Sequence, residues 1–183
     1  MSKTWSTTIK HKTGIFNIPL KEIIQYRGLI FTLVKRNYEV QYKQTLLGPV
    51  WMIIGLIFSS GIFSFVFGYV GKFSSDGSPY FLFYMTGALM WEFFSACFNS
   101  NKSVLIDNSY LYGKVYFPRL IMPIANVIFE AVRSAIKFVV CLIVWGYFLH
   151  IGEACFCGIK ILWLVPISIA TALMGMSSGV VLS

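Results

Sequence analysis

The chain has 183 residues, of which 57% are hydrophobic and only 12% are charged, and its mean hydropathy is +0.72. A soluble domain usually carries about a quarter charged residues, so this composition argues against a soluble enzyme and predicts an integral membrane protein. The net charge of +8 would also suit nucleic-acid binding, but eight of the fifteen Lys and Arg residues precede Gly48, ahead of the first apolar run. That distribution is typical of cytosolic loop charge, and no nucleic-acid partner is expected.

Residues 1–19 predict a cytosolic lead without a cleavable signal peptide, so that the first span itself directs insertion. Residues 20–47 predict an amphipathic helix in the lipid headgroup layer, because polar and apolar side chains fall on opposite arcs of a helix. The polar arc comprises Lys21, Gln25, Thr32, Lys35, Arg36, Glu39 and Lys43, and the apolar arc comprises Leu20, Ile23, Ile24, Ile30, Phe31, Leu33, Val34 and Tyr38. A solvated helix on a soluble domain is the alternative, which the following apolar run disfavours.

Gly48 and Pro49 end this helix, since proline suits only the first turn of a new one. No charged residue occurs between Lys43 and Lys72, and an uncharged run of about 20 residues can cross a bilayer. The same reasoning places four spans within a transmembrane domain of residues 48–183, at 50–70, 79–98, 120–149 and 161–182. The expected fold class is all-α: a polytopic membrane helix bundle with one N-terminal amphipathic helix and four transmembrane helices.

The connection 99–119 is predicted to lie in the cytosol together with the N-terminus. It contains three cations, whereas the two turns on the other side contain one each, and positive charge concentrates on the cytosolic side. These cations are Lys102, Lys114 and Arg119 in the connection and Lys72 and Lys160 in the turns. In the fourth span, the small residues Gly175, Ser177, Ser178 and Gly179 predict a close approach to another helix.

Four charged residues fall within the expected spans, namely Glu92, Glu130, Arg133 and Lys137. Intramembrane charges normally pair with one another or face the bundle interior, so a local Glu130–Arg133 pair and a direct transport role are the two alternatives. The chain has no nucleotide-binding, zinc-protease or serine-hydrolase motif, so we assign no catalytic residue, metal or cofactor and do not expect an enzyme. Cys155 and Cys157 are interpreted as free thiols rather than an oxidised pair, whose ring would be strained.

Three stretches together resemble one family. They are KRNYEVQYKQTLLGPVW at 35–51, WEFF at 91–94 and KVYFPR at 114–119, and they occur in the order found in permease subunits of type 2 ABC transporters that export polysaccharide, including O-antigen, capsule and teichoic acid. The sequence departs from the family pattern at Asn37, where aspartate is common, and at Gln41, which is often basic. Members have six spans, so the resemblance implies a permease truncated at its C-terminus, with autonomous transport in doubt.

The resemblance implies that two permease copies pair with two cytosolic ATPase subunits in the bacterial cytoplasmic membrane and export a polymer attached to an isoprenoid diphosphate lipid. The connection 99–119 is then the candidate ATPase contact, with a plain connecting loop as the alternative. Its candidate residues are Leu105, Asp107, Asn108, Leu111, Lys114, Val115, Phe117, Pro118 and Arg119.

Two further sets of residues follow from the same resemblance. Candidates for contact with lipid headgroups, or with lipid diphosphate, are Lys35, Arg36, Tyr42, Lys43, Gly48 and Pro49. Candidates for lining a channel, where aromatic faces suit sugar rings, are Tyr80, Phe81, Tyr84, Trp91, Glu92 and Phe94, with helix packing as the alternative. Alternatives to the permease are a gradient-driven lipid or sugar flippase, a membrane-bound transferase and a nonfunctional truncated permease.

Overall fold

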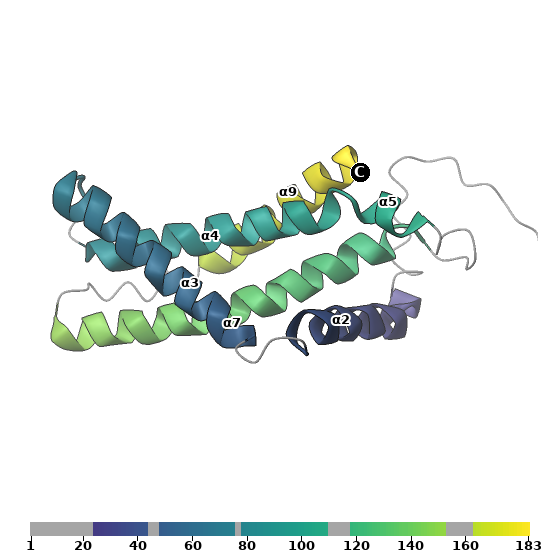
Figure 1. Cartoon of the computed structure of the whole chain (residues 1–183), viewed down its shortest axis with the longest axis horizontal. Coiled ribbons are helices and arrows are strands. Elements are labelled where there is room, and N and C mark those ends of the chain that lie inside the picture. The colour runs from purple at the N-terminus through teal and green to yellow at the C-terminus, as the bar shows by residue number, and fades with distance from the viewer. Residues whose placement is uncertain (1–23, 44–47, 76–77, 110–117, 153–162) are drawn as a thin grey trace, which may run out of the picture.

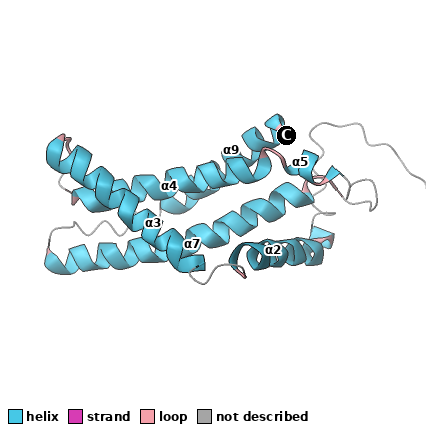
Figure 2. Ribbon diagram, in the orientation of Figure 1, coloured by secondary structure: helices cyan, strands magenta, loops and turns pink. Residues whose placement is uncertain are grey.

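The computed structural model describes residues 24–43, 48–75, 78–109, 118–152 and 163–183. All regular structure in these ranges is helical, so the all-α prediction is confirmed (Figure 2). The elements are α2 (Arg27–Tyr42), α3 (Gly48–Phe63), the π-helix η1 (Ser64–Val70), α4 (Tyr80–Asn101), α5 (Val104–Asp107), α7 (Ile121–Ile151) and α9 (Leu164–Leu182).

The long helices form a bundle in which α4 is central. Helix α4 packs against α9, α7 and α3, and α2 packs beside the N-terminal half of α7. Figure 1 shows α4, α7 and α9 running in alternating directions, so that α5, the start of α7 and the C-terminus lie at one end of the bundle. The connection 99–119 belongs to this end of the bundle, so this is the end that the charge distribution predicts to be cytosolic.

Three helical stretches are long and apolar enough to cross a membrane: Val50–Val70, Tyr80–Asn101 and Leu164–Leu182. They correspond to three of the four expected spans. Helix α7 has 31 residues and is not among them; it carries the charged side chains of Glu130, Arg133 and Lys137. The chain is therefore a multi-pass helical membrane protein, and the membrane crossing by α7 stays a prediction.

The apolar arc of α2 divides between two environments. Ile30 is buried, and Leu33 and Val34 pack with it against Ile121 and Ala125 of α7. Ile24, Phe31 and Tyr38, from the same predicted arc, are exposed. Part of the arc therefore docks on α7 rather than facing lipid, while the rest is available to the headgroup layer. Residues 20–23 and 44–47 of the predicted helix lie outside the described residues.

Helix α7 is longer than expected and ends at Ile151. Gly152 follows with φ +84°, a left-handed conformation that stops a helix at little cost only when the residue is glycine. Its amide donates to the carbonyls of Leu149 and Phe148, which closes the last turn of α7. The helix therefore continues two residues beyond the end of the third expected span at residue 149, and Cys155 and Cys157 lie outside the described residues.

Candidate functional site

Four charged side chains meet between α4 and α7. Lys137 donates to the carboxylate of Glu92, and Nη1 of Arg133 donates to both oxygens of Glu130, at 2.8 and 3.1 Å. The three residues on α7 recur at spacings of three and four, which places them on one face of the helix. The local Glu130–Arg133 pair is thus confirmed, while the Glu92–Lys137 pair joins residues 45 positions apart and was not foreseen.

This cluster is compact and electrically balanced. Its two acids and two bases line a cavity of about 30 Å³, together with apolar side chains such as Leu89 and Phe93. The side chain of Glu130 is 9% exposed and that of Lys137 is 15% exposed. A cavity of this size holds about one water molecule, so this space itself is too small to pass a polymer.

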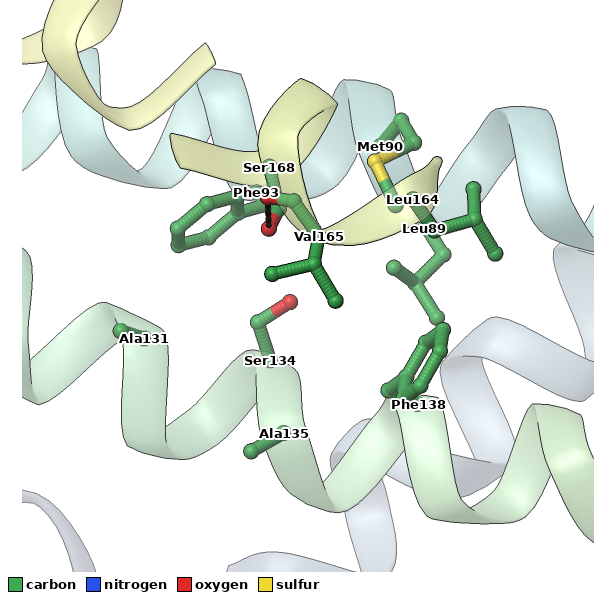
Figure 3. A pocket seen from close by; sticks show the side chains of 10 residues that line it. All are labelled: Leu89, Met90, Phe93, Ala131, Ser134, Ala135, Phe138, Leu164, Val165 and Ser168. Atoms are coloured by element: carbon green, nitrogen blue, oxygen red, sulfur yellow. Dashed lines mark hydrogen bonds between the residues drawn. The ribbon is translucent and has the colours of Figure 1, made fainter. Parts of the chain in front are cut away.

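A larger, apolar cavity lies next to the cluster, between α4, α7 and α9. Its volume is about 190 Å³, and Figure 3 shows it surrounded mainly by aliphatic and aromatic side chains, with Ser134 pointing into the space between α7 and α9. The other hydroxyl, on Ser168, donates to the carbonyl of Val165 at 2.7 Å and is already satisfied. The cavity therefore offers little polar recognition and suits only a small apolar group.

A third cavity, of about 450 Å³, separates α2 from the ends of α4 and α7. In contrast to the previous one, it is lined largely by polar side chains: Arg36, Asn37, Gln41, Ser100, Asn126 and Glu130, with Val40 and Phe129. Asn37 donates to Asn126, and Asn126 donates to the carbonyl of Ser100. Sequence reasoning missed Asn126 and Ser100, because nothing in their local pattern indicates a partner on another helix.

The candidate headgroup residues are mostly exposed where the structure describes them. Lys35 and Arg36 are exposed, with Arg36 at the rim of the polar cavity, and Lys43 forms an ion pair with Glu39 at 3.2 Å that is open to solvent. Tyr42 instead points toward α3 and donates its hydroxyl to the sulfur of Met52 at 3.5 Å. Helix α3 begins at Gly48, with Pro49 in its first turn.

The candidate ATPase contact contains a short helix, α5. Leu105 and Asp107 lie on it and Asn108 directly follows it, while Pro118 and Arg119 precede α7. Asp107 accepts a hydrogen bond from Ser103 at 2.6 Å, and Asn108 donates to the carbonyl of Val104 at 2.8 Å. Leu111, Lys114, Val115 and Phe117 lie outside the described residues. Sequence reasoning missed Ile106, an apolar side chain on α5 that is 65% exposed.

The candidate channel-lining residues lie on two faces of α4: Tyr80, Tyr84, Trp91 and Phe94 share one face, and Phe81 and Glu92 lie about 100° around the helix from it. Phe81 packs in the core with Leu56 and Met85, and Glu92 is held in the charge cluster. The other four take part in local contacts: Tyr80 beside Gly68, Tyr84 with Phe67 and Phe83, and Trp91 with Phe94. Trp91 is nevertheless 68% exposed, and the lining of a channel by these residues stays a prediction. Among the described residues, no three His, Cys, Asp or Glu side chains gather in a way that could hold a metal ion.

Comparison with known proteins identifies the family. The family model described as ABC-2 type transporter matches residues 28–183. The chain belongs to this family. An ABC-2 type membrane protein is a transport subunit rather than a catalyst, which agrees with the multi-pass helical architecture described above.

Similar curated proteins support the same assignment. An O-antigen export system permease protein RfbA from Myxococcus xanthus is 29% identical over 109 residues, which are 60% of this chain and 41% of that protein. Two proteins of the same name from Klebsiella pneumoniae are 26% and 27% identical over 105 residues, which are 57% of this chain and 40% of each relative. The matched part of this ABC-2 type chain thus spans about two fifths of the length of these relatives.

Proposed function

We propose that this chain is the membrane subunit of an ABC exporter that moves a lipid-linked polysaccharide of the O-antigen type across the bacterial cytoplasmic membrane. A separate cytosolic ATPase supplies the energy, and a second copy of the permease completes the path. The observation that carries the proposal is the family match over residues 28–183, together with relatives that are O-antigen export permeases.

The arrangement of the helices supports this proposal. Helix α5, the candidate ATPase contact, lies at the same end of the bundle as the start of α7 and the end of α9 (Figure 1). We place this end, and the N-terminus, in the cytosol because the cations concentrate there. A contact at this end would transmit movement of an ATPase directly into three long helices.

The proposal is tested by asking whether the permease needs an ATPase. We expect a Walker-type ATPase to co-purify with the chain from detergent-solubilised membranes and its deletion to abolish export of the polymer. Unchanged export in cells that lack every candidate ATPase would overturn the proposal. Polymer on the cell surface is measured with an antibody, and the amount of permease in the membrane serves as the internal control.

The contact itself is tested at Ile106. The substitution Ile106→Asp places a carboxylate in a surface that we expect to be apolar when the ATPase is bound. We predict that the ATPase recovered with the permease falls roughly tenfold while membrane insertion is unchanged. The matched control is Phe73→Asp, the same kind of change at another exposed apolar residue, in the turn between η1 and α4. Equal recovery from both variants would remove α5 from the contact.

A gradient-driven flippase, the alternative to an ATP-driven exporter, would use the four charged residues in the spans as ion or proton sites. The structure pairs all four in two ion pairs around a cavity of about 30 Å³, which favours a structural role for them. Collapse of the proton gradient at constant ATP distinguishes the alternatives, since it should leave an ATP-driven exporter active and stop a gradient-driven one.

A further inference from the structure

Side-chain amides join α2, α7 and the end of α4. Asn37 Nδ2 on α2 donates to Asn126 Oδ1 on α7 at 3.2 Å, and Asn126 Nδ2 donates to the backbone carbonyl of Ser100 at 2.8 Å. Asn126 therefore uses both ends of one amide group to bridge two other helices. Its partners lie 89 and 26 residues away, so the bridge exists only in the folded bundle.

The carbonyl of Ser100 needs a donor from outside its own helix. It belongs to the last turn of α4, which ends at Asn101, and carbonyls in a last turn have no intrahelical partner. The backbone amide of Lys102, the first residue after α4, donates to the carbonyl of Phe98 at 3.0 Å. Asn126 consequently caps α4 from another helix and fixes the point at which the chain leaves α4 for α5.

Helix α5 is held on its other side by α9. The amide of Leu105 donates to the hydroxyl of Ser183 at 2.9 Å, and Val104 is buried. The short helix is therefore attached to the end of α9 and follows the end of α4 after only two residues. A displacement of α5 must move the end of α4, and Asn126 connects that end to α7 and α2.

The amide bridge lies beside an apolar contact. Ile30 of α2 packs against Ile121 and Ala125 of α7, and Asn126 directly follows Ala125. The apolar contact holds α2 near α7 but allows sliding, because dispersion and hydrophobic contacts have no direction. The hydrogen bond from Asn37 has a direction and sets the register of α2 along α7.

We propose that Asn126 is a positioning residue that makes α2, the N-terminal half of α7 and the end of α4 move as one body when α5 is displaced. The inference rests on the proposed function, since it takes α5 as the ATPase contact. Through Asn126, a movement of the ATPase reaches the amphipathic helix that borders the polar cavity of about 450 Å³. Asn126 touches no substrate in this scheme and acts through the helices that it joins.

The first experiment separates transport from ATP hydrolysis. In Asn126→Leu both bonds are lost, in Asn126→Asp the donor to Ser100 is lost, and in Asn37→Asp the donor to Asn126 is lost. We expect exported polymer per ATP hydrolysed to fall roughly fivefold or more in Asn126→Leu, with unchanged ATPase co-purification and membrane level. The matched control is Asn99→Leu, an exposed asparagine on α4 whose side chain donates within its own helix, to the carbonyl of Ser95. A ratio in Asn126→Leu equal to that of the control would overturn the proposal.

A cross-link provides a second test, in which one variant is compared with itself before and after the two helices are joined. Cysteines are placed at positions 37 and 126 in a background in which Cys97, Cys141, Cys155 and Cys157 are replaced, and a short reducible bifunctional thiol reagent joins them. If α2 and α7 move as one body, the joined protein should export at least as well as the same variant before joining. Loss of export that returns on reduction would show that α2 must slide on α7 and would refute the inference.

The two proposals fail in different ways. Export that continues without any ATPase contradicts the proposed function. Export that requires the ATPase, but keeps its normal ratio of polymer to ATP in Asn126→Leu, contradicts only the role of Asn126. Combining Asn37→Asp with Asn126→Leu should add no further loss, because both changes break the same connection.

Discussion

Helix α4 packs against α9 and against α7 by different physical means. Toward α9 it presents backbone, because Gly175 and Gly179 bring the two helices so close that a Cβ atom on either would meet α4 at 2.8–2.9 Å. Toward α7 it presents large side chains, with Leu89 and Met85 in the core and Glu92 paired with Lys137. The first contact depends on the absence of side chains and the second on matched ones.

The difference shows how one helix can serve two roles in a membrane protein. Without water to drive helices together, close packing of small residues gives a stable and uncharged contact. Buried charges hold helices together only when they remain paired, so the contact with α7 is sensitive to the loss of either partner. Each interface also contains one buried cysteine: Cys97 lies against Gly175 of α9, and Cys141 of α7 lies near Thr86 of α4. The rate at which a thiol reagent labels each cysteine therefore reports on its interface.

The largest effect is expected at the charge cluster. The substitution Glu92→Gln keeps the shape of the side chain but leaves the cluster with one excess positive charge. We expect the folded permease to be destabilised by about 3 kcal/mol. The loss should appear as less permease in the membrane and as faster labelling of Cys141 by a thiol reagent, measured in a variant without Cys155 and Cys157.

The matched control for this change restores neutrality. In Glu92→Gln combined with Lys137→Met, neither partner is charged and the length of the lysine stem is kept. The double variant should recover most of the lost stability, because replacing a whole ion pair costs less than breaking one. A double variant as unstable as Glu92→Gln alone would mean that shape, and not charge balance, holds α4 to α7.

The next largest effect is expected at the glycine contact. Replacing Gly175 and Gly179 by alanine places a Cβ 2.9 Å from the side chain of Cys97 in one case and 2.8 Å from the carbonyl of Phe98 in the other. Backbone cannot move aside easily, so we expect a loss of about 1–3 kcal/mol and faster labelling of Cys97 than of Cys141. Gly87→Ala is the control, since nothing lies within 4 Å of the added atom. Equal labelling of both cysteines would show that the two interfaces open together.

The helices could be predicted from the sequence because their limits are set locally. Uncharged runs, prolines and loop charges bound the expected spans, and α4 at Tyr80–Asn101 and α9 at Leu164–Leu182 occupy two of them. The small residues of α9 also predicted a close helix contact, which the approach of Gly175 and Gly179 to α4 confirms. The helix that they contact depends on the tertiary structure, and no local sequence pattern identifies that helix.

The candidate site was predicted less completely, for the same reason. The Glu130–Arg133 pair was foreseen because a spacing of three on a helix brings side chains together. The pairing of Lys137 with Glu92, and of Asn126 with Asn37 and Ser100, depends on how helices far apart in sequence are placed side by side. An asparagine within an apolar helix indicates that some partner exists but not which one.

The smallest effect is expected at Thr86, which tests whether a neutral polar contact adds to the α7 interface. Its hydroxyl lies 3.9 Å from the sulfur of Cys141 but also donates to the carbonyl of Leu82, one turn earlier on its own helix, at 2.9 Å. The hydroxyl is satisfied without α7, so Thr86→Val should cost no more than about 0.6 kcal/mol and leave the labelling rate of Cys141 nearly unchanged. A cost as large as that of Glu92→Gln would mean that the thiol contact, rather than the ion pairs, holds α7 against α4. A small free-energy cost for Thr86→Val would mean that charge balance and the packing of Leu89 and Met85 hold α7 against α4. The contact between α4 and α9 instead depends on the small size of its glycines.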